Sequence, residues 1–79
     1  MNSNYRDFSP LARTIAYFVF RKKEATYSSI KKRFGEKRTG IGIEELMSQN
    51  PPLISFNLER MTYQPSECFK KILSPLNLI

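Results

Sequence analysis

Residues 53–65 read Leu53-Ile54-Ser55-Phe56-Asn57-Leu58-Glu59-Arg60-Met61-Thr62-Tyr63-Gln64-Pro65, and this stretch decides the fold. Its first half alternates apolar and polar side chains, with the apolar ones at Ile54, Phe56 and Leu58. Residues 61–64 continue the alternation. A period of two is typical of half-buried strands, because successive side chains point to opposite faces. We therefore predict a β-hairpin that turns at residues 57–60, although the usual Asn-Gly or Asp-Gly turn pair is missing.

A helix is predicted before the hairpin, near the start of the chain. Ser9-Pro10 is a start signal, since Ser caps helices and Pro suits the first helical position. Apolar residues then recur with helical spacing of four and three, which predicts a helix to about Lys23. They are Leu11, Ile15, Phe18 and Val19. Residues 1–8 read as a short N-terminal tail, and residues 9–79 as one domain.

A second, short helix is predicted from Thr26, its capping residue, to Gly35, its C-cap. Residues 35–42 contain all three glycines of the chain and match no phosphate-binding signature, so they are interpreted as a flexible loop. A third helix is expected from about Ile43, with Ile43, Leu46 and Met47 facing inward. Asn50-Pro51-Pro52 would end it.

After the hairpin, Pro65-Ser66 would begin a last helix that ends at Pro75. Its inward positions would be Phe69, Ile72 and Leu73, while Leu76, Leu78 and Ile79 form an apolar tail end. Cys68 reads as a small, partly buried apolar residue beside Phe69.

The positive charge of the chain is concentrated in one segment. The whole chain of 79 residues has 13 Lys and Arg against 7 Asp and Glu, a net charge of +6. Residues 21–38 contain eight of these cations against Glu24 and Glu36 only, so this segment also carries +6 and the remainder carries zero. The eight cations are Arg21, Lys22, Lys23, Lys31, Lys32, Arg33, Lys37 and Arg38. Such segregation favours a surface that binds a polyanion, above all nucleic acid. An acidic protein partner, or a merely solubilising face, remains an alternative.

Several classes of function have little support in the composition. Without histidine the chain lacks the commonest general base and metal ligand, and a lone cysteine forms neither an internal disulfide nor a Cys-based zinc site. We therefore expect no catalytic residues, no metal and no cofactor. The longest apolar run, residues 15–20, is too short to span a membrane, and no targeting segment is visible. A membrane-free, intracellular protein of the cytoplasm or nucleus, cellular or viral, is expected.

The predicted elements suggest a known architecture. The order helix, helix, helix, hairpin, helix has the ingredients of a winged helix, and a short strand around residues 25–27 would complete it. Residues 46–56 and 60–65 resemble the end of the third helix and the wing of winged-helix domains. They are similar to the winged helix of the general transcription factor IIE beta subunit. The resemblance covers about twenty residues by sequence, and the remainder only by element order. It implies an α+β, mostly helical fold, DNA binding and a role as a transcriptional regulator.

One feature departs from the usual helix-turn-helix mode, in which the third helix reads the major groove. The exposed face of that helix would carry Glu44, Glu45 and Ser48, and two carboxylates repel phosphates. We therefore expect the second helix and the loop after it to contact phosphates. The contacting residues would be Lys31, Lys32, Arg33, Lys37 and Arg38, with Arg60 from the wing. Binding through five phosphates would give a salt slope of about −4.5 on duplex DNA.

Two other modes of binding stay open. Most phenylalanines fall on inward positions, and the aromatics inside the basic segment, Tyr27 and Phe34, also suit the core, so single-strand stacking is a minor option. An interaction module for a transcription or replication complex would use the acidic third helix and the apolar tail. A homodimer through the broad apolar stripe of the first helix is a related alternative.

Overall fold

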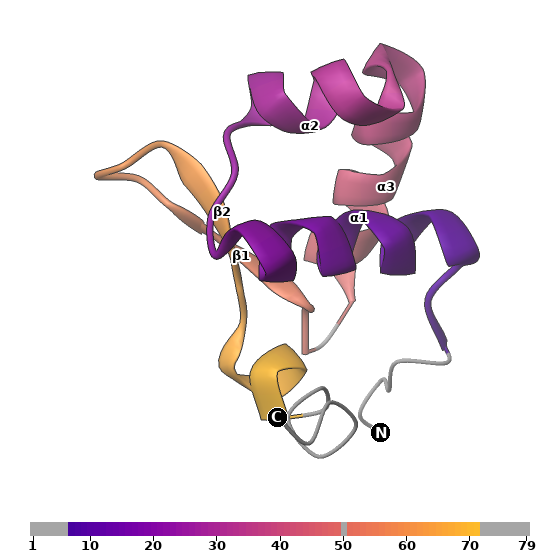
Figure 1. The fold of residues 1–79 in the computed structure, drawn as a ribbon. Coiled ribbons are helices and arrows are strands. Elements are labelled where there is room, and N and C mark those ends of the chain that lie inside the picture. The colour runs from indigo at the N-terminus through magenta and orange to yellow at the C-terminus, as the bar shows by residue number, and fades with distance from the viewer. Residues whose placement is uncertain (1–6, 50, 72–79) are drawn as a thin grey trace.

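The structure, a computed structural model, describes residues 7–49 and 51–71 and is mostly helical with one antiparallel hairpin (Figure 1). Its elements are α1 (Pro10–Lys22), α2 (Tyr27–Phe34), α3 (Glu36–Ser48), β1 (Ile54–Asn57) and β2 (Thr62–Pro65). Residues 67–71 form a further helical turn. The α+β class and the predicted order of elements are confirmed.

Helix α1 begins where the sequence predicts it, and its start is fastened to α3. The Ser9 hydroxyl accepts a hydrogen bond from the Ala12 N–H at 3.1 Å. The Glu45 carboxylate in turn accepts from the Ser9 N–H and hydroxyl, both at 2.7 Å. Two otherwise unsatisfied backbone donors are thereby paired. The inward face buries Ala12, Ile15, Ala16 and Val19.

Helix α2 also follows its local signals. The Thr26 hydroxyl accepts from the Ser29 N–H at 3.1 Å, and Ile30 is buried. Gly35 ends the helix with φ near 94°, a conformation that side-chain-bearing residues rarely adopt. Its N–H donates to the Lys31 carbonyl at 2.7 Å.

The interpretation of residues 35–42 as a flexible loop is wrong, because α3 begins directly after Gly35. Glycine is a poor helix former, but tertiary packing outweighs its propensity here. Gly42 is buried against α1, where a Cβ atom would overlap Ile15 Cδ1 and lie 3.6 Å from Leu11 Cγ. A glycine at this position lets the two helices approach closely.

The remainder of α3 agrees with the prediction in part. Ile43 and Leu46 are buried as expected, but Met47 is 41% exposed, so its inward assignment is wrong. The buried residues of α3 are Thr39, Gly42, Ile43 and Leu46, and Met47 lies beside them in the more exposed part of the helix. Helix α3 ends at Ser48, before the two prolines.

The hairpin pairs Ile54 with Pro65 at its base and Asn57 with Thr62 at its turn. Phe56 and Tyr63 contact across the strands, with ring centroids 4.8 Å apart. Leu58 lies in the turn, as predicted, and is 78% exposed although it continues the apolar alternation of β1. The Asn57 side-chain oxygen accepts from the Arg60 N–H at 3.1 Å, which takes the place of the missing turn pair.

An extended residue before α2 joins the hairpin, as predicted. Ala25 and Tyr63 exchange two backbone hydrogen bonds, of 2.9 Å and 2.8 Å. The chain between α1 and α2 thus pairs with the free side of β2.

The core also contains residues from both ends of the described chain. Phe8, the last residue of the predicted tail, is buried. Phe69 is buried against Phe20, and the neighbouring Cys68 is partly buried, both as predicted. The predictions for residues 1–6, for Asn50 and for residues 72–79, including Ile72, Leu73, Pro75 and the apolar tail end, concern positions outside the described residues.

A polar cluster around Glu24 fastens the hairpin to the end of α1. The Arg60 guanidinium makes two bonds to the Glu24 carboxylate, Nε to Oε1 at 2.7 Å and Nη2 to Oε2 at 2.6 Å. Thr62 and Gln64 donate to Glu24 Oε1 at 3.0 Å and 3.3 Å. The hydrogen bond from Arg60, followed by that from Thr62, lowers the pKa of Glu24 to about 2. The same carboxylate raises the pKa of Arg60.

None of the helices in the described ranges is both long and apolar enough to cross a membrane.

The two helical glycines of α3 should respond oppositely to alanine. Gly40→Ala meets nothing closer than the Tyr27 hydroxyl at 3.9 Å, so it should stabilise the protein by about 0.5–1 kcal/mol. Gly42→Ala forces the buried Ile15 side chain to move, and overpacking costs about 1–3 kcal/mol, which outweighs the helix gain. Urea unfolding of both variants measures the difference. Equal stabilisation by the two substitutions would disprove the close contact between α1 and α3.

The Glu24 cluster should make stability depend on pH. The pKa of Glu24 is lowered in the folded protein, so its stabilisation is complete above its ordinary value near 4.5 and is lost as the pH falls toward 2. We expect Glu24→Gln to lower the melting temperature at neutral pH, with a deficit that shrinks between these two pH values. Glu59→Gln, in the exposed hairpin turn, is the matched control and should follow the parent protein. A deficit independent of pH would contradict the assignment.

Candidate nucleic-acid interface

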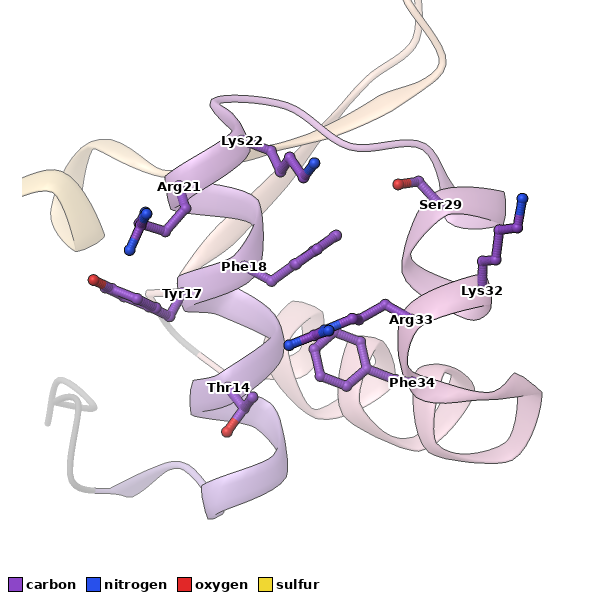
Figure 2. Close-up of a pocket in the computed structure, with 9 residues that line it drawn as sticks. All are labelled: Thr14, Tyr17, Phe18, Arg21, Lys22, Ser29, Lys32, Arg33 and Phe34. Atoms are coloured by element: carbon purple, nitrogen blue, oxygen red, sulfur yellow. The ribbon is translucent and has the colours of Figure 1, made fainter.

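A cleft between α1 and α2 brings together four of the sequence-predicted cations. Arg21 and Lys22 come from the last turn of α1, and Lys32 and Arg33 from the last turn of α2. The cleft has a volume of about 590 Å³ and is open to solvent (Figure 2). Thr14, Tyr17, Phe18, Ser29 and Phe34 complete its lining. No carboxylate occurs among these described lining residues, so like charges face one another across the cleft.

Each helix sends an aromatic ring into the cleft. Phe18 points from α1 toward α2 (Figure 2), and its ring meets Phe34 edge to face with centroids 5.6 Å apart. Both rings are half-buried and pack on the core, so they form a fixed apolar floor. Tyr17 stands on the α1 rim and is 38% exposed.

The cations lie beside these rings. Lys22 Nζ is 5.7 Å from the Phe18 centroid, Arg21 Cζ is 5.8 Å from the Tyr17 centroid and Arg33 Cζ is 6.0 Å from the Phe34 centroid. Such contacts are worth about 0.5–1 kcal/mol at exposed sites. They hold the cations near the cleft without neutralising their charge, because a ring carries no net charge.

The basic surface continues on both sides of the cleft. A second hollow, lined by Ser28, Ser29, Lys31, Lys32 and Glu36, shares Ser29 and Lys32 with it. A third, lined by Phe20, Arg21, Lys23, Pro65 and Lys70, shares Arg21. We call the three adjoining hollows the basic track; its cations are Arg21, Lys22, Lys23, Lys31, Lys32, Arg33 and Lys70.

Three of the predicted site residues, Lys37, Arg38 and Arg60, lie outside the basic track. Lys37 and Arg38 are exposed on the first turn of α3, not in a loop, and line none of these three hollows. Arg60 is engaged by Glu24. Lys31 is within the basic track, 3.7 Å from Glu36, and both side chains are well exposed, so this ion pair is weak.

The prediction that Glu45 lies on the exposed face of the third helix is wrong. Glu44 and Ser48 are exposed as expected, but Glu45 is half-buried and bonded to Ser9. The exposed carboxylates of α3 are therefore Glu36 and Glu44, and the earlier start of the helix also adds Lys37, Arg38 and Ile41 to its exposed side.

The sequence reasoning missed the aromatic floor and Lys70. A signal for the floor exists, because Thr14, Tyr17, Phe18 and Arg21 recur at helical spacing of three, one and three on one side of α1. Phe18 also falls on the apolar stripe of the first helix, and this spacing predicts a core residue. Lys70 joins the track only through the packing of the last helix near α1.

Over residues 7–49 and 51–71, no group of three His, Cys, Asp or Glu side chains is arranged to hold a metal ion. Searches of protein-family models, of curated proteins and of solved structures found no match to the chain. The chemistry of this surface is therefore inferred from its own charges, rings and shape.

Proposed function

We propose that this chain is a nucleic-acid-binding protein that contacts the phosphates of duplex DNA through the basic track. The observation that carries the proposal is the convergence of Arg21 and Lys22 from α1 with Lys32 and Arg33 from α2 around one cleft. Holding like charges close together is unfavourable unless a polyanion neutralises them. A surface that served solubility alone would gain nothing from this arrangement.

The proposal includes a winged-helix architecture. Support comes from three helices followed by a hairpin, and from the pairing of Ala25 with Tyr63, which adds a short strand before α2. Binding through α2 and the end of α1 would differ from the usual entry of the third helix into the major groove. Contacts to phosphates position a protein but carry no sequence information, so we expect weak sequence preference. A role as a transcriptional regulator stays a prediction.

A protein-docking function is the second candidate, and one observation favours it. Ile41 and Met47 are 53% and 41% exposed on α3, outside the basic track. A partner protein that covered either side chain would remove apolar surface from water. Loss of a complex on Ile41→Asp, with DNA binding unchanged, would establish this function beside the first.

The test is binding of labelled duplex DNA of mixed sequence as salt is raised. If the track neutralises about five phosphates, log K should fall with log salt with a slope of about −4.5. Lys32→Glu should weaken binding and reduce the slope by about 1 or more, since Lys32 is shared by two of the hollows.

Lys71→Glu makes the same charge change on an exposed residue that lines none of the three hollows, and is the matched control. It should alter binding much less than Lys32→Glu does. No binding at low salt, or equal losses in the two variants, would overturn the proposal.

A further inference from the structure

The α1–α2 cleft contains more than phosphate binding requires. Phosphate groups on a duplex need cations and hydrogen-bond donors, and they have no flat apolar surface to place on an aromatic ring. Yet the floor of the cleft is formed by Phe18 and Phe34, with Tyr17 on its rim. Phe18 and Phe34 pack on the core with one side and remain partly exposed among the cations of the cleft.

The spacing of rings and cations matches a ligand that carries both an aromatic face and a negative charge. Lys22 and Arg33 lie 5.7 Å and 6.0 Å from the centroids of Phe18 and Phe34, so a group resting on either ring would have an ammonium or guanidinium beside it. Cation–ring contacts are weak at exposed sites, so a phosphate can draw the cation away from the ring face.

The hydroxyls of Thr14 and Ser29 on opposite sides of the cleft add hydrogen-bonding groups. Ser29 is exposed, and its N–H is bonded to Thr26 while its hydroxyl faces the cleft (Figure 2). Thr14 donates its hydroxyl proton to the Pro10 carbonyl at 2.8 Å, which leaves its oxygen lone pairs as acceptors. A ligand with both donors and acceptors, as a nucleobase has, suits these groups.

We propose that this cleft holds an unpaired nucleotide, with its base against Phe18 and Phe34 and its phosphate among Lys22, Lys32 and Arg33. The inference rests on the nucleic-acid-binding function proposed above and adds a preference for strands that are not fully paired. Stacking on aromatic side chains combined with a positive groove is the general means of holding single strands. A volume of about 590 Å³ lies within the range for small-ligand sites of about 300–1,000 Å³.

The test compares three DNA probes of equal duplex length: a blunt duplex, a duplex with a short single-stranded overhang, and the same overhang without its bases. The base-free overhang keeps every phosphate, so it separates stacking from charge. We expect the overhang with bases to bind about tenfold tighter than the other two, which corresponds to one stacked base. Overhangs of both polarities are measured.

Variants then locate the stacked base. Phe18→Leu keeps apolar packing but removes the ring face, and Tyr17→Leu removes the exposed rim ring with little risk to folding. At least one of them should abolish the preference for the overhang with bases, measured as the ratio of overhang to blunt-duplex affinity within the same variant. Tyr27→Leu is the matched control, since Tyr27 is 40% exposed on α2 and does not line the cleft.

The outcomes separate the two proposals. If none of the probes binds, the nucleic-acid-binding function itself fails. If the three probes bind equally, or the base-free overhang binds as well as the intact one, the nucleotide site is disproved and the duplex-binding function stands. A preference that survives both Phe18→Leu and Tyr17→Leu also disproves this site. A melting curve for each variant identifies a loss that is due to unfolding.

Discussion

The close contact between α1 and α3 is the constraint on which the remainder of the structure depends. Gly42 lets the backbone of α3 lie against Ile15, and Glu45 bonds to the start of α1 a turn later. With its inward face occupied by α3, α1 can offer only its flank to α2. The cleft is the space that this arrangement leaves between α1 and α2, and its cations stand where both helices end.

The position of these cations at helix ends reduces the energetic cost of placing like charges close together. Arg21 and Lys22 occupy the last turn of α1, and Lys31, Lys32 and Arg33 the last turn of α2. Cations are stabilised there by the partial negative charge of the unpaired carbonyls. Part of the positive charge is therefore stabilised by the fold itself, without a ligand. Contacts with the aromatic rings hold the cationic side chains near the cleft. The repulsion that remains across the cleft is what a polyanion would relieve.

Local signals were enough to predict α1, α2 and the hairpin, because Ser9, Thr26 and the alternation after Leu53 act within a few residues. The start of α3 could not be predicted in this way. Position 42 requires glycine because Ile15, a residue far away along the chain, packs directly against it. Judged from local sequence alone, isolated glycines argue against a helix. The charged half of the cleft was visible as a cluster of Lys and Arg. Its aromatic half was not, because which flank of α1 meets α2 depends on how three helices pack.

The pairing of Glu24 with Arg60 affects the distribution of charge over the molecule. It cancels the one cation of the hairpin turn, and Glu59 beside it is exposed, so the hairpin tip is close to neutral or slightly acidic. Positive charge is gathered around the ends of α1 and α2. The positive charge of the described residues is therefore displaced from the hairpin tip toward the ends of α1 and α2. A long polyanion would attract these helix ends more strongly than the hairpin tip, which favours an approach with the cleft facing the polyanion.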